Sequence, residues 1–79
     1  MFHKIKNVKA LKDYILEVTF ENGEIKYYDI KPLFNKWSAF QDLENKHLFE
    51  QVKVDTKGYG ISWNDDIDLS CNELYNNGK

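Results

Sequence analysis

The chain has 79 residues, enough for one small domain, and its five Phe, five Tyr and two Trp can fill a modest core. Eleven lysines stand against thirteen acids and arginine is absent, so a general binder of polyanions is not expected. Cys71 is the only cysteine, which excludes an internal disulfide, and no apolar run predicts secretion or membrane spanning. We therefore expect a cytoplasmic protein.

The first predicted element is an edge strand within His3–Leu11, where Ile5 and Val8 supply the apolar positions. Residues 1–12 also carry four lysines and no acid, and the lysines are Lys4, Lys6, Lys9 and Lys12. Lysines on an edge strand discourage pairing with other chains, so we interpret this run as a solvated edge. The alternative is a strip that binds nucleic acid or an acidic partner.

Asn22-Gly23 predicts a β-hairpin across Tyr14–Ile30, because both residues tolerate the positive φ that a type I′ turn requires. A two-residue loop would pair Phe20 with Ile25. One face of the hairpin would then be apolar, and it would consist of Leu16, Val18, Phe20, Ile25 and Tyr27. The other face would hold Glu17, Thr19, Lys26 and Tyr28.

Two short helices are expected next. Pro32 suits the first turn of a helix, and the following stripe of Leu33, Phe34, Trp37 and Phe40 has helical spacing. We expect this stripe to cover the apolar face of the hairpin, with a ligand-binding aromatic patch as the alternative. A second helix is predicted within Leu43–Gln51, with Asn45 as its N-cap.

A second, looser hairpin follows, with strands Val52–Asp55 and Tyr59–Trp63. Asn64–Leu69 is expected to be an acidic loop, and Ser70 and Glu73 match a capping box that starts a last helix. Residues 76–79 are expected to fray. The predicted fold is a single α+β domain over residues 1–79, with an antiparallel sheet of about five strands and two or three short helices.

No pattern in the chain predicts catalysis, a cofactor or a metal site. His3, His47 and Cys71 are scattered without the spacing of zinc ligands. The acids Asp65, Asp66, Asp68 and Glu73 lack the ligand spacing of a calcium loop, so a solvated loop is the better interpretation. Cys71 fits a half-buried structural cysteine better than a reactive thiol. We therefore do not expect an enzyme.

Aromatic residues on the predicted strands are candidates for an interaction surface. Proteins that stack the bases of single-stranded nucleic acid on aromatic side chains do so in basic grooves. Acids adjoin the aromatics of this chain, which favours a role in packing or in protein binding. The candidate surface residues are Tyr28, Tyr59, Trp63, Lys4, Lys6 and Lys9.

Several stretches of the chain resemble a small bacterial family known as domain of unknown function 2442. They keep the family's order along nearly the whole chain, and they are residues 6–14, 18–24, 28–33, 40–43, 48–55, 61–63 and 67–69. The resemblance implies an α+β fold like the N-terminal domain of a two-domain protein whose other half is a helix-turn-helix. It also implies a small protein as a frequent genetic neighbour, which suggests toxin–antitoxin-like pairs. It implies no activity, cofactor or catalytic residue.

The leading hypothesis is a non-catalytic module that binds a small partner protein, or a second copy of itself, through a sheet edge or an aromatic face. The alternative is a regulator associated with nucleic acid through Lys4, Lys6, Lys9 and Lys12.

Overall fold

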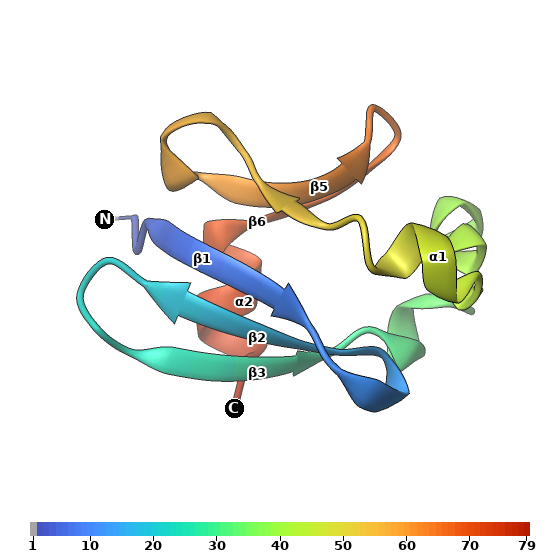
Figure 1. Ribbon diagram of the computed structural model, residues 1–79, viewed down its shortest axis with the longest axis horizontal. Helices are drawn as coiled ribbons and strands as arrows, with labels where there is room; N and C mark the ends of the chain where they lie inside the picture. The colour runs from blue at the N-terminus through green and yellow to red at the C-terminus, as the bar shows by residue number, and fades with distance from the viewer. Residues whose placement is uncertain (1) are drawn as a thin grey trace.

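A computed structural model describes residues 2–79 and shows an α+β fold, as predicted. Six strands form two three-stranded antiparallel sheets, in place of the expected sheet of about five strands. The first sheet has the order β1-β2-β3 and the second β4-β5-β6 (Figure 1). The strands are β1 (Ile5–Ala10), β2 (Ile15–Phe20), β3 (Ile25–Asp29), β4 (Lys53–Val54), β5 (Gly60–Asn64) and β6 (Ile67–Ser70). The helices are α1 (Lys46–Phe49) and α2 (Cys71–Asn77), with 3-10 turns at Lys12–Tyr14, Lys31–Leu33, Ser38–Glu44 and Thr56–Gly58.

The β2–β3 hairpin forms where it was predicted, but its predicted register is wrong by one residue. The loop has three residues: Phe20 N–H donates to Glu24 O (2.8 Å), Gly23 N–H donates to Phe20 O (3.0 Å), and Gly23 has φ 95°. Leu16 therefore lies opposite Tyr28, and Thr19 opposite Ile25. Because side chains alternate along a strand, this one-residue shift turns every side chain of β3 to the other face.

The core lies between the inner faces of the two sheets and is closed by α2, which passes behind them in Figure 1. β4 lies beside β1, and the turn at Gly58 approaches the backbone of Ile5 so closely that a Cβ on Gly58 would lie 2.5 Å from the Ile5 carbonyl oxygen. Gly58 also has φ 79°, so no other residue fits this junction between the sheets without strain. The largest fully buried side chains include Phe20, Phe49, Leu16, Ile61 and Leu74.

The predicted helix with an aromatic stripe is a series of 3-10 turns instead. Trp37 has extended backbone angles (φ −134°, ψ 131°), which separate the turn at Lys31–Leu33 from the one at Ser38–Glu44. Leu33 and Phe40 are buried as expected, but Trp37 is 48% exposed. The stripe therefore covers the core only in part.

Both predicted N-caps are present. The side chain of Asn45 accepts a hydrogen bond from His47 N–H (3.0 Å) and starts α1, which is shorter than predicted. Ser70 Oγ accepts from Glu73 N–H (3.1 Å) and starts α2. The reciprocal half of the capping box is missing, because the Glu73 carboxylate accepts instead from the Tyr28 hydroxyl (2.7 Å).

The chain from Asn64 onward is more ordered than the sequence suggested. Asn64 Oδ1 accepts from Asp66 N–H and Ile67 N–H, and this turn leads into β6, a strand that was expected to be a loop. Residues 76 and 77 complete α2 in place of a frayed tail, and Lys79 N–H donates to Tyr27 O (2.8 Å). Among the described residues, no helix is long and apolar enough to cross a membrane.

Lys57 has φ 67° and ψ 6°, a left-handed conformation that glycine adopts at much lower cost. Lys57→Gly is therefore expected to raise the free energy of unfolding by about 0.5–1 kcal/mol, as measured by urea denaturation. Lys53 lies in the extended strand β4 and serves as the control, because Lys53→Gly should lower it by about 0.5–1 kcal/mol. A loss of stability in both variants would contradict the strained backbone at Lys57.

Candidate interaction surface

β3 forms an open edge of the first sheet, because β2 is its only strand neighbour in the described chain. At the two ends of the β2–β3 pairing, Phe20 N–H donates to Glu24 O and Ile30 N–H donates to Tyr14 O. In an antiparallel ladder the bonds alternate, so the N–H and C=O groups of residues 26 and 28 point to β2. Those of Ile25, Tyr27 and Asp29 point away from it. Of these outward groups, Tyr27 O accepts a bond from Lys79 N–H.

Two large apolar side chains stand on the outer face of this edge. Ile25 is 53% exposed and lies opposite Thr19 on β2. Tyr27 is 45% exposed and lies opposite Glu17, whose Oε2 accepts from the Tyr27 hydroxyl (3.3 Å). The register predicted from the sequence would place Ile25 and Tyr27 in the core, so neither was expected at the surface.

An open pocket of about 490 Å³ lies beside the same edge. Its walls come from the hairpin, from the first 3-10 turn after β3 and from the end of α2, and include Tyr27, Pro32, Leu33, Asn77 and Lys79. Most of this lining is apolar, which is typical of sites that receive a side chain or a small molecule.

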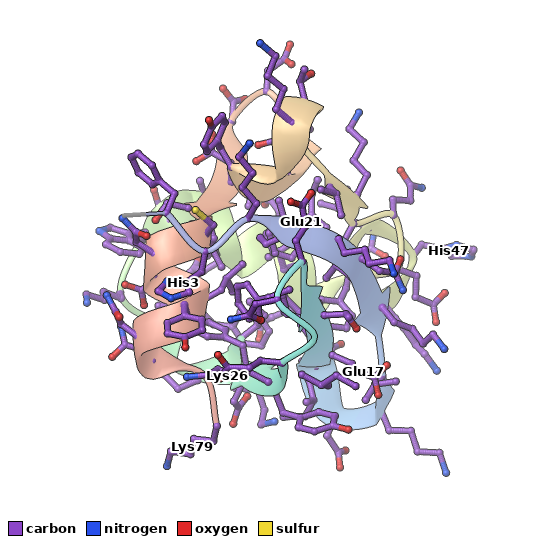
Figure 2. The ribbon with its side chains drawn as sticks, turned by 90° about the vertical axis from the view of Figure 1, so that its left-hand side faces the viewer. His3, Glu17, Glu21, Lys26, His47 and Lys79 are labelled. Carbon is purple, nitrogen blue, oxygen red and sulfur yellow. The ribbon has the colours of Figure 1, made fainter. Side chains whose placement is uncertain are left out.

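The inner face of β3 is bound to α2. Figure 2 shows Lys26 pointing toward α2, with Glu17 on the other side of the hairpin. Lys26 Nζ donates to Tyr75 O (2.7 Å) and lies 4.0 Å from the centre of the Tyr75 ring, while His3 stacks on that ring with centroids 3.5 Å apart. Hydrogen bonds from Tyr75 and Asn22 lower the pKa of the Glu24 carboxyl, which keeps it ionised.

Burial of the Tyr28 hydroxyl, and then its hydrogen bond to the Glu73 carboxylate, raise the pKa of Tyr28 well above its ordinary value. The unfolded chain therefore loses this proton first as the pH rises. The stability that depends on Tyr28 should be complete below about pH 10 and should decline as the pH rises above it. Urea midpoints between neutral and alkaline pH test this, with Tyr28→Phe as the matched variant, since it lacks the ionisable group. An equal decline in both proteins would contradict the prediction.

Two of the predicted surface residues are buried. Tyr28 and Trp63 are buried, with 6% and 4% exposure, so neither belongs to an exposed patch. For Tyr28 the reason is the shifted register. For Trp63 it is its inward position on β5, where the indole N–H donates to Phe49 O (3.0 Å).

Tyr59 remains exposed and forms a small cluster with the N-terminal segment. The Phe2 ring meets it edge to face at a centroid distance of 5.4 Å, and Lys4 Nζ lies 5.2 Å from the Tyr59 ring centre. No pattern in the sequence had indicated Phe2 as a surface residue. We call Phe2, Lys4 and Tyr59 the N-terminal cluster.

The other lysines of the first strand do not extend this cluster into a strip. Lys6 and Lys9 are exposed, but Lys9 lies opposite Glu17 on the outer face of the first sheet. Lys12 belongs to the 3-10 turn after β1. Lys4, Lys9 and Lys12 therefore lie on different parts of the surface.

The remaining candidate ligands and nucleophiles lie apart. Cys71 is buried in the first turn of α2, His3 is stacked on Tyr75, and His47 points away from the body of the protein in Figure 2. Within residues 2–79, no group of three or more His, Cys, Asp or Glu side chains is arranged to hold a metal ion.

A family model described as "Protein of unknown function (DUF2442)" matches residues 5–79. Comparison with curated proteins finds no significant match. Among solved structures, the chain is similar to a crystal structure from Nitrosomonas europaea described as a "Putative DNA Binding Protein", with a TM-score of 0.83 and 23% identity. The similarity covers 100% of this chain and 50% of that one, so this chain spans about half its length. At this identity the likeness shows the fold alone. A helix-turn-helix in the other half stays a prediction.

Proposed function

The chain belongs to the DUF2442 family, to which no activity is assigned, and from its surface we propose that it is a non-catalytic protein-interaction module. Its binding surface is the outer face and open edge of β3, with Ile25 and Tyr27 at the centre. We name these two residues, with the neighbouring pocket, the β3 surface. The partner is a small protein, such as the genetic neighbour that the family resemblance implies, in a toxin–antitoxin-like pair.

One observation supports this proposal above the others: two large apolar side chains are exposed next to an open pocket and a sheet edge that has no strand neighbour in the described chain. Single exposed apolar residues are ordinary, but apolar groups that adjoin an open edge mark sites where proteins meet. Elsewhere the hairpin is well packed, since Leu16, Val18 and Phe20 are fully buried. The exposure of β3 is thus a local property of its outer face.

Co-expression with the protein encoded by the neighbouring gene, followed by size-exclusion chromatography, tests the proposal. We expect one shared peak for the parent chain at micromolar concentration. Ile25→Thr/Tyr27→Thr should separate the two proteins, because threonine suits a strand but removes most of the apolar surface. Phe2→Thr/Tyr59→Thr is the matched control, since it removes two exposed aromatic residues from the N-terminal cluster. Separate peaks for the parent chain would contradict the proposal.

A second candidate function is nucleic-acid binding, and the N-terminal cluster favours it. Exposed aromatic rings beside a lysine can stack on bases while the cation contacts phosphate. The description of the Nitrosomonas europaea relative points the same way, although it applies to a chain twice as long. The formal charge of −2 and the dispersed lysines weigh against this reading.

Mobility-shift assays at low salt test the second candidate with single-stranded and duplex DNA. A complex that weakens steeply with salt, and that Tyr59→Leu/Lys4→Gln abolishes, would support it. Lys46→Gln on α1 is the control for loss of one positive charge. The absence of a shift at low salt would exclude this function.

A further inference from the structure

We infer that the partner binds by strand addition: an extended, basic segment pairs with the open edge of β3 and places a large apolar side chain in the adjoining pocket. This inference rests on the proposed function and specifies how the β3 surface recognises its partner.

The backbone of β3 turns a row of hydrogen-bonding groups away from β2. Ile25, Tyr27 and Asp29 alternate with the residues that bond to β2, so their N–H and C=O groups face outward. Lys79 already uses one of these groups, since its N–H donates to Tyr27 O from an extended stretch after α2 (Gly78 φ −73°, ψ 155°). The edge therefore accepts extended backbone. The outward groups of Ile25 and Asp29 remain for a partner, and a partner strand that pairs along the whole edge would displace Lys79 from Tyr27 O.

The two edges of the first sheet are protected very differently. β1 carries exposed Lys6 and Lys9, has a register shift between Ile5 and Asn7, and lies beside β4. Lysines, bulges and covering segments are the usual means by which proteins block strand addition. β3 has a regular register and no proline, and its one lysine, Lys26, points inward to Tyr75. The edge of β3 is thus the less protected of the two, with Lys79 bonded to it at Tyr27.

Charge indicates the chemistry of the partner. Residues 14–31 contain four acids (Glu17, Glu21, Glu24 and Asp29) against Lys26 and Lys31. Lys26 bonds to Tyr75 O within the protein, and Lys31 and Asp29 pair with each other at 3.0 Å, so Glu17, Glu21 and Glu24 are the acids that a partner would meet. A segment with lysine or arginine on either side of its apolar residue would complement this acidic hairpin.

A second copy of this chain fits the edge less well than such a segment. Antiparallel pairing of two β3 strands about a two-fold axis at Tyr27 would place Ile25 opposite Asp29 of the other copy, an apolar side chain against a carboxylate. It would also bring two acidic hairpins together, and like charges across a sheet are unfavourable.

A synthetic peptide tests the inference on the 79-residue chain. The probe is acetyl-Lys-Val-Lys-Leu-Lys-Val-Lys-amide, and the control is the same peptide with N-methyl groups on alternate backbone nitrogens, which blocks strand pairing. Binding is followed by amide NMR shifts, and pairing by hydrogen exchange at Ile25 and Asp29. We expect saturable binding below about 1 mM, slower exchange at both amides, and a loss of at least about tenfold in affinity for the N-methylated peptide.

Two protein variants separate backbone pairing from side-chain contact. Ile25→Pro removes an outward N–H that β2 does not use, and proline is tolerated at such edge positions. Ile25→Thr keeps that N–H and removes apolar surface. Strand addition predicts the larger loss of affinity for Ile25→Pro. If this variant fails to fold, the N-methylated peptide alone decides the matter.

Three kinds of result would overturn the inference. Equal binding of both peptides, or unprotected Ile25 and Asp29 amides in the complex, would show recognition by side chains without strand pairing. No binding at about 1 mM would exclude a segment of this chemistry. A peptide-independent dimer that protects both amides would identify a second copy as the occupant. A shared peak in the co-expression experiment would preserve the proposed function in the first two cases, whereas its absence would refute that function separately.

Discussion

Replacing Tyr28 with alanine is expected to lower the free energy of unfolding by about 3–5 kcal/mol, which is a large part of the stability of so small a domain. The buried ring would leave a cavity next to Leu16, its cross-strand neighbour. The Glu73 carboxylate would also lose the hydrogen bond that it accepts from the Tyr28 hydroxyl. Urea denaturation monitored by far-UV circular dichroism measures the loss.

The adjacent residue provides the matched control. Tyr27 is half exposed on the outer face, and its hydroxyl makes one long bond of 3.3 Å to Glu17. Tyr27→Ala should therefore lower the free energy of unfolding by less than about 1 kcal/mol. The reverse order of effects would mean that β3 turns its other face to the core and that the β3 surface described above does not exist.

Trp63→Ala is expected to cost about 3–5 kcal/mol and to leave much of the protein unfolded at ordinary temperature. The indole packs against Phe40 and Phe49, and its N–H donates to Phe49 O, so truncation removes both apolar contact and a buried hydrogen bond. Thermal unfolding of the variant should occur far below that of the parent chain.

Tyr59→Ala is the control for Trp63→Ala, because Tyr59 is exposed and adjoins the same strand. Its effect should stay below about 1 kcal/mol. Fluorescence gives a second test: in Trp37→Phe the remaining emission comes from Trp63 and should resist quenching by acrylamide. Strong quenching in that variant would place Trp63 at the surface and contradict the packing between the sheets.

The parts of the fold that depend on local chemistry could be predicted from the sequence. Asn22-Gly23 located the hairpin, and Asn45 and Ser70 located the starts of α1 and α2. Each of these signals acts within a few residues, through positive φ or through a side chain that accepts a backbone N–H.

The register of the hairpin could not be predicted in this way. Asn22-Gly23 suits a two-residue loop and also the three-residue loop that forms, in which Gly23 alone has positive φ. The choice between them depends on distant contacts: Tyr28 bonds to Glu73 and Lys26 to Tyr75, which lie more than forty residues further along the chain. A pattern within the hairpin contains no information about α2.

The candidate surface shifted with the register. Tyr28 and Trp63, which were predicted at the surface, are buried in the core, whereas Ile25 and Tyr27, which were predicted in the core, are exposed. Trp37 became exposed because the expected helix is broken at that residue into separate 3-10 turns. Alternation and helical spacing predict which residues share a face, but the packing of the whole chain decides which face is buried.

The central claim is that β3 turns Ile25 and Tyr27 outward along an open edge, and NOE spectroscopy tests it most directly. In antiparallel sheets the α-protons of non-hydrogen-bonded pairs lie close together across the strands. The structure predicts strong α-proton NOEs between Glu17 and Tyr27 and between Thr19 and Ile25. Strong NOEs between Val18 and Tyr27 and between Phe20 and Ile25 would restore the register of the two-residue loop, bury both residues, and contradict the account.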